Sequence, residues 1–331
     1  MALLTRIYFN AVFGALGGLL GWLLWGVFGE KTSSDEAMKW QLLMGGGIIG
    51  GAIGYWVVSV EAIRDHSLIR FVRLACYGVV LGMVGGAIGM YLGERLNFKI
   101  VGLIKEGDRA TAANFLGCMF SFGLGMMLLG LGVGMSEGIA ARSLGKFSYG
   151  TLGGAIGGFV GGAFYGLTYL LKVNKQNDAL SAGLAAPDAA LSGAIGLIIL
   201  GACIGSLSAL VQGVLLPASV KVMRGWQEGR EYPLDKPKVE LGRDEHVDIA
   251  LFRDMRVEKH HALICRVGQG YSLVNNGAPP EFTRVNDMPV PQSVALQDGD
   301  RIQLGNVLLR FQMRAAQNRA RRRAGAAGAR R

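Results

Sequence analysis

Six long apolar runs fill the first two thirds of this chain of 331 residues. A helix needs about 20 predominantly apolar residues to cross the hydrocarbon core of a bilayer. Charged or polar stretches separate the runs, and no run carries Lys, Arg, Asp or His at its centre. The sequence therefore predicts a membrane all-α domain over residues 1–218, with six spans over approximately 8–29, 41–60, 71–93, 114–137, 148–171 and 189–215.

The glycines in these runs recur at a fixed interval. Two adjacent glycines followed by a third four positions after the first occur at Gly17, Gly85 and Gly153, which are 68 residues apart each time. Repetition at a constant period is a strong sign of a duplicated structural unit. We therefore expect three helical hairpins derived from one unit, an arrangement that is also common in transport proteins.

Glycines spaced four residues apart form stripes along several of the predicted helices. Such stripes let two helix backbones approach closely in lipid, where van der Waals contact drives association. The pattern resembles a glycine zipper. It fits helix packing within one chain, and it also fits contacts between copies of the chain. We therefore expect further copies in a homo-oligomer among the partners. The predicted packing positions are Gly17, Gly21, Gly50, Gly54, Gly85, Gly89, Gly153, Gly157 and Gly161.

Glu61 and Glu137 are the acids closest to membrane depth in the predicted spans, and each has an arginine nearby, Arg64 and Arg142. Ionisable groups inside a membrane are functional candidates by default. Because both acids lie near helix ends, we expect interfacial ion pairs rather than a proton or ion site.

The charges around the last span indicate the orientation. Lysines and arginines follow it closely, from Lys221 to Lys238, and such residues are enriched on the cytoplasmic side. Six spans place both ends of the domain on one side. The sequence therefore predicts an inner-membrane protein of the cell with cytoplasmic N- and C-termini.

The pattern changes after the last span. A linker is predicted over 219–225, and short alternating runs separated by turn signals then predict an all-β sandwich over 226–314. The basic segment 315–331 is predicted to be a disordered tail. Together with Arg314 it carries seven arginines and no acid. These favour contact with anionic membrane lipids. Nucleic acid is an unlikely partner, because no aromatic residues are interleaved.

The β-rich region resembles the forkhead-associated (FHA) domain, a phosphothreonine-peptide reader built as a two-sheet β-sandwich. The order and spacing of its motifs match over about 225–314. The residues that carry the resemblance are Leu241-Gly242-Arg243, Asp248-Ile249, Val257–Ala262, Thr283–Asn286, Leu296–Asp300, Ile302 and Gly305.

The resemblance implies roles for several of these residues. Arg243 matches the family's phosphate-binding arginine, while Glu258 and Lys259 occupy the positions of its serine–arginine pair. A carboxylate beside a phosphate repels it, so binding in the family's usual mode is expected to be weak. Partner binding is also assigned to Asn276 and Thr283, and structural roles to Gly242, His261 and Asn286.

No catalytic or metal site is predicted. The four cysteines form no CxxC pair, and the histidines show no metal-ligand spacing. The sequence predicts a chain that is not an enzyme and binds no cofactor or metal. The favoured function is a membrane-anchored scaffold that presents a variant FHA domain to a cytoplasmic protein. The family resemblance implies phosphothreonine as the ligand and phosphorylation-linked signalling as the process. The alternatives are a glycine-driven membrane assembly subunit, or a channel or transporter with a regulatory FHA-like domain.

Overall fold

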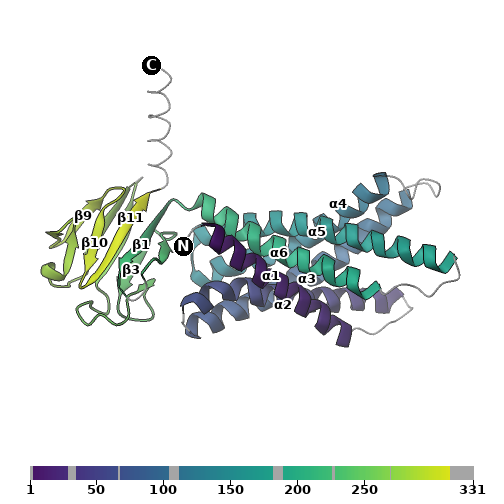
Figure 1. Ribbon diagram of the computed structural model, residues 1–331, viewed down its shortest axis with the longest axis horizontal. Helices are drawn as coiled ribbons and strands as arrows, with labels where there is room; N and C mark the ends of the chain where they lie inside the picture. Colours follow the sequence, from purple (N-terminus) through teal and green to yellow (C-terminus); the bar gives the residue numbers. More distant parts are fainter. Residues whose placement is uncertain are drawn as a thin grey trace, which may run out of the picture. The chain divides into compact units, whose positions relative to one another are not determined.

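The computed structural model describes residues 3–28, 35–65, 68–103, 112–181, 189–225, 228–268 and 270–313. The chain divides at about Leu215 into two compact units, one helical and one built of strands. Both are drawn in Figure 1.

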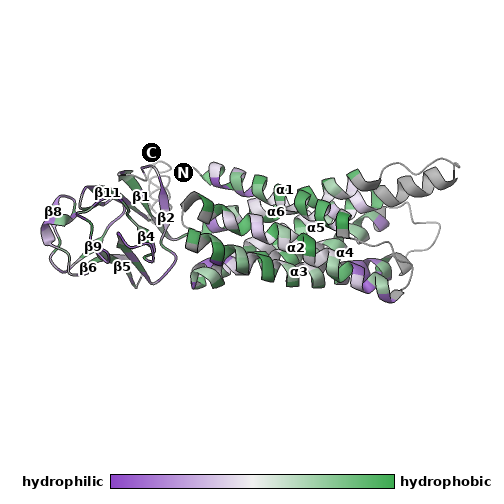
Figure 2. Ribbon diagram, turned by 90° about the horizontal axis from the view of Figure 1, so that it is seen from below, coloured by the Kyte–Doolittle hydropathy of each residue, from purple (hydrophilic) through white to green (hydrophobic). Residues whose placement is uncertain are grey.

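Within the described residues, the helical unit contains six long α-helices, which confirms the predicted fold class. Each contains a segment of 25 to 30 residues that is long and apolar enough to cross a membrane. Apolar residues dominate along these helices in Figure 2. The helices are α1 (Leu3–Phe28), α2 (Asp35–Asp65), α3 (Leu68–Leu103), α4 (Ala112–Ala141), α5 (Leu144–Ser181) and α6 (Ala189–Leu215).

The paired glycines direct each odd-numbered helix against two neighbours. A Cβ atom at the first glycine would meet the next helix, 2.7 Å from Ile53 Cα in the case of Gly17. A Cβ atom at the second glycine would overlap the backbone of the other neighbour, so that Gly18 faces Leu197. In the same way Gly85 faces α4 and Gly86 faces α2, whereas Gly153 faces α6 and Gly154 faces α4.

These contacts join the six helices into a closed ring, because α1 contacts both α2 and α6. The side chains at the centre come from the even-numbered helices, including Ile53, Leu129 and Leu200, all fully buried. All nine predicted packing glycines lie against a helix of the same chain. The close approaches that glycine permits are therefore made within one copy.

A chain of polar contacts crosses the helical unit near the start of α1. The guanidinium of Arg6 donates to Gln212 Oε1 at 2.6 Å, and Gln212 Nε2 donates to Glu137 Oε2 at 2.6 Å. Glu137 is buried. It is therefore joined through Gln212 to an arginine of another helix, a link that the local spacing to Arg142 did not predict. The predicted pair Glu61 and Arg64 lies outside the described side chains.

The second unit is a sandwich of two sheets. The order is β2-β1-β11-β10-β7-β8 in one sheet and β4-β3-β5-β6-β9 in the other, with β3 and β4 parallel and all other pairs antiparallel. The strands are β1 (Ala218–Arg224), β2 (Glu231–Pro233), β3 (Lys238–Gly242), β4 (Ile249–Ala250), β5 (Ala262–Val267), β6 (Gly270–Asn275), β7 (Thr283–Val285), β8 (Met288–Pro289), β9 (Ser293–Leu296), β10 (Arg301–Leu304) and β11 (Val307–Met313).

The predicted linker 219–225 is wrong, because strand β1 occupies residues 218–224. This strand pairs with β11 on one side and β2 on the other. Val220 and Val222 enter the core of the sandwich, so the run is a structural element rather than a tether. The predicted tail 315–331 lies outside the described residues.

Candidate partner-binding site

Three loops meet at one end of the sandwich and are joined through their backbones. The amide of Arg243, in the β3–β4 loop, donates to Glu258 O at 2.9 Å in the β4–β5 loop. The amide of Asn276, in the β6–β7 loop, donates to His261 O at 3.1 Å. We call this end, formed by residues 243–248, 251–261 and 276–282, the recognition end.

Gly242 permits the close approach of two of these loops. It is buried at the end of β3, and a Cβ atom there would lie 2.7 Å from the carbonyl carbon of Lys259. That separation is shorter than ordinary van der Waals contact. A side chain at this position would therefore push the β4–β5 loop away from β3.

His261 connects the recognition end to the other sheet. Its Nδ1 accepts a hydrogen bond from the Glu258 amide at 3.0 Å, which leaves the proton of a neutral ring on Nε2. Nε2 then donates to the hydroxyl of Thr283 at 2.9 Å. Burial lowers the pKa of His261 below its usual 6.5, which favours this neutral form.

Thr283 is a correction to the predicted site. Its side chain is 0% exposed, because this residue of β7 points into the sandwich towards His261. It therefore cannot contact a partner in this structure. Its hydroxyl instead satisfies a buried histidine.

The structure brings Arg243, Glu258, Lys259 and Asn276 to the recognition end. Glu258 and Lys259 are exposed, and the Arg243 guanidinium lies 2.8 Å from Met255 Sδ. Met255 is 79% exposed, a large apolar side chain that the motif comparison did not single out. Cationic, anionic and apolar groups thus share one end of the domain.

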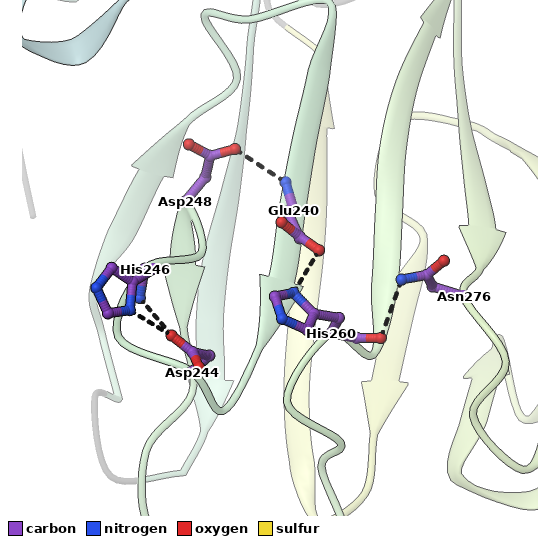
Figure 3. A network of polar contacts seen from close by, with 6 residues as sticks. All are labelled: Glu240, Asp244, His246, Asp248, His260 and Asn276. Atoms are coloured by element: carbon purple, nitrogen blue, oxygen red, sulfur yellow. Dashed lines mark hydrogen bonds and ion pairs between the residues drawn. The ribbon is translucent and has the colours of Figure 1, made fainter.

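Two histidines of these loops pair with carboxylates, and one of them, His260, lies beside Asn276 (Figure 3). His246 contacts Asp244 and His260 contacts Glu240, with ring nitrogen to carboxylate distances of 2.8 Å in both pairs. Hydrogen bonding from the His246 backbone amide lowers the pKa of Asp244. The sequence motif points to neither pair: Asp244 and His246 meet within one loop, whereas Glu240 and His260 are brought together by the fold.

Asn276 and Asn286 have different surroundings. The side-chain amide of Asn276 donates to His260 O at 3.2 Å and the residue stays exposed at the recognition end (Figure 3). Asn286 begins the two-residue turn between β7 and β8, where it and Asp287 have φ of 50° and 68°. Asparagine and aspartate tolerate such values, which hairpin turns of this length favour.

Asp254 ties the β4–β5 loop to the turn between β10 and β11. Its carboxylate accepts hydrogen bonds from the Asn306 amide at 2.6 Å and from the Arg256 amide at 3.1 Å. The exposed residues that follow in the loop are therefore anchored at both ends, by Asp254 and by His261.

Metal binding has no support in the described part of the chain, where no group of three or more His, Cys, Asp or Glu side chains converges. The four cysteines, all within described segments, are free thiols.

Comparison with known proteins assigns the C-terminal region. Residues 221–315 match the family model described as the cytoplasmic domain of an inner membrane component of the T3SS. No curated protein sequence matches the chain.

Several solved FHA domains are similar to this region. One, from a study of phosphothreonine-dependent FHA interactions, is 30% identical, with 29% of this chain and 96% of that chain covered and a TM-score of 0.27. The FHA domain of FhaA, solved with the intracellular domain of Rv3910, is 29% identical, covering 29% and 99%, with a TM-score of 0.26. The FHA domain of CT664 from Chlamydia trachomatis is 23% identical, covering 29% and 96%, with a TM-score of 0.27.

The family match covers the sandwich and does not extend to the six helices. The C-terminal domain of this chain is thus similar to the cytoplasmic domain of that family and, in the motif residues quoted above, to forkhead-associated domains.

Proposed function

We propose that this chain is a membrane-anchored scaffold, not an enzyme, that presents its FHA domain to cytoplasmic protein partners. The observation that carries the proposal is the recognition end, where Arg243, Glu258 and Lys259 extend from loops that backbone hydrogen bonds hold in place. Binding groups on a rigid frame lose little entropy when a partner docks. The match to a cytoplasmic domain of an inner membrane component supports an inner-membrane location with both termini in the cytoplasm.

Glu258 favours partners that bind without a phosphate. A phosphothreonine carries a charge of about −1.5 to −2, which an adjacent carboxylate repels. A hydrogen bond from serine to a charged phosphate contributes about 1.5–3 kcal/mol, equivalent to roughly ten- to a hundredfold in affinity. Glutamate at this position removes that contribution, so we expect the domain to distinguish poorly between phosphorylated and unphosphorylated segments.

A peptide-binding experiment tests this proposal. The full chain in lipid nanodiscs would be screened against matched phosphothreonine and unmodified peptides, together with Glu258→Ser and Arg243→Ala. Wild type should bind with little preference for phosphate, and Glu258→Ser should gain at least about tenfold for the phosphorylated series. Strong phosphate preference in wild type, lost in Arg243→Ala, would instead establish a phosphothreonine reader. If no peptide of either series binds wild type or Glu258→Ser, the scaffold proposal itself fails.

The glycine contacts bear on the two alternatives. All nine predicted glycines lie against helices of their own chain, so a homo-oligomer would have to use other surfaces. The helical unit is filled at its centre by aliphatic side chains from α2, α4 and α6. Neither observation favours an assembly subunit or a transporter over the scaffold.

A further inference from the structure

The third membrane helix carries an acid that the apolar pattern of the sequence leaves outside the span. The predicted span ends at residue 93, whereas α3 continues to Leu103 and its apolar segment reaches Ile100. Glu94 therefore belongs to the membrane-spanning segment, where an acid is a functional candidate by default. At the 68-residue interval of the repeats the equivalent residues are Gly26 and Gly162, so the acid occurs in only one of the three units.

The carboxyl group of Glu94 is half-buried and accepts a hydrogen bond from the hydroxyl of Tyr169 on α5, at 3.4 Å from Oε1. Among the side chains that the structure describes, no Lys, Arg or His forms an ion pair with Glu94. Arg95, the next residue, lies over the Tyr91 ring instead, with its Cζ atom 5.4 Å from the ring centroid. Within this described part, nothing offsets the cost of removing a carboxylate from water.

The other titratable groups around Glu94 carry no positive charge. Cys118 of α4 and Tyr165 and Tyr169 of α5 form one cluster and lie within electrostatic range of the Glu94 carboxyl group. Thiols and phenols are uncharged at neutral pH, so these side chains offer hydrogen bonds only. The described charged side chains at the same end of α2 and α3 are exposed: Glu36, Lys39, Arg95 and Lys99.

Asn97, almost one turn further along α3, lacks a donor. It is 8% exposed, and its Oδ1 atom has no hydrogen-bond partner. It lies between Gly93 and Ile100, which both contact α4. Buried polar atoms are almost always hydrogen-bonded, so this acceptor calls for an explanation. Residues three apart on a helix have Cβ atoms about 5–6 Å apart, which places the side chains of Glu94 and Asn97 within reach of each other.

A proton on Glu94 satisfies both residues. An ionised carboxylate only accepts hydrogen bonds, whereas a protonated carboxyl group also donates one. Because Tyr169 donates to Oε1, a proton on Oε2 supplies the donor that Asn97 Oδ1 lacks. Protonation also removes an unpaired charge from an apolar environment, which is how such groups commonly avoid the cost of burial.

We infer that Glu94 is a proton-binding site of the helical unit, which takes up one proton from water and donates it in a hydrogen bond to Asn97. The ligand is the proton itself, so the site needs no cavity. The inference concerns the six helices alone. It rests neither on the recognition end nor on the orientation of the chain in the membrane.

Infrared spectroscopy of the full chain in lipid nanodiscs tests this inference, because only a protonated carboxyl group shows the C=O band of a carboxylic acid. At neutral pH, wild type should show one such band that Glu94→Gln lacks, and the band should move to lower frequency in D₂O. Glu36→Gln is the matched control, since it removes an exposed acid of α2 and should leave the band unchanged. Asn97→Leu should shift the band to higher frequency, because the carboxyl group loses one hydrogen bond.

Identical spectra of wild type and Glu94→Gln in the carboxylic acid region would overturn the inference, by showing that Glu94 is ionised. A band that does not move in D₂O would contradict proton exchange with water. An unchanged frequency in Asn97→Leu would refute the assigned hydrogen bond. Peptide binding at the recognition end is measured separately, so failure of one proposal is distinguishable from failure of the other.

Discussion

Gly242→Ala is predicted to loosen the recognition end without unfolding the sandwich. An alanine Cβ atom would lie 2.7 Å from the carbonyl carbon of Lys259, so the β4–β5 loop must move by about 1 Å or more to reach ordinary contact. The hydrogen bonds from the Arg243 amide to Glu258 O and from the Asp244 amide to Lys259 O, at 2.9 and 3.3 Å, cross this gap.

The magnitude follows from those two bonds. Each backbone hydrogen bond contributes about 0.5–1.5 kcal/mol to stability, so their loss would cost about 1–3 kcal/mol locally. A cost of 1.4 kcal/mol corresponds to a tenfold change in an opening equilibrium. Amide hydrogen exchange at Arg243 and Asp244 should therefore accelerate by roughly five- to a hundredfold.

The assay is hydrogen exchange with mass spectrometry on the full chain in nanodiscs. Gly270→Ala is the matched control, because a Cβ atom there would approach Val267 O no closer than 3.7 Å. The control should leave exchange at the recognition end unchanged. Unaltered exchange at Arg243 and Asp244 in Gly242→Ala would refute the proposed role of the glycine.

Three further predictions concern other contacts. Because burial lowers the pKa of His261, the unfolded state binds a proton at a higher pH than the folded state does. The free energy of unfolding, measured with urea, should therefore decrease as the pH falls below about 6.5, and by more in wild type than in His261→Gln. The same pH dependence in both proteins between pH 7 and 5 would contradict this. Gly50→Ala should lower the thermal midpoint of the helical unit, because its Cβ atom would overlap the Gly82 backbone, whereas Gly47→Ala, whose nearest neighbour is at 3.7 Å, should not. Gln212→Leu removes two hydrogen bonds to charged groups and should cost about 3 kcal/mol in the detergent-solubilised chain; an unchanged thermal midpoint would show that this polar link contributes nothing.

Much of the fold follows from local patterns. Apolar runs of sufficient length predict all six helices, because backbone polar groups in lipid must be satisfied within a helix. The order and spacing of the motifs between Leu241 and Gly305 carry the family resemblance. The sequence predicts a linker in place of strand β1, because the basic residues of this strand fit the flank of a membrane span equally well. Its pairing with β11 depends on residues almost a hundred positions later.

Which way a short strand's side chains point is not decided by its own sequence. The family resemblance predicts a partner contact for Thr283, yet β7 has only three residues, too few for alternation to indicate the buried face. The core and the neighbouring strand β10 determine that Thr283 points inward, where it meets His261.

The sequence by itself determined the membrane character of the first two thirds, the positions of the packing glycines and the FHA motif, because each depends on residue type and spacing along the chain. Only the tertiary structure decided what those glycines contact, because the identity of a neighbouring helix is a property of the closed ring. It alone placed Met313 beside Ala218, because strand register joins residues without regard to their separation in sequence.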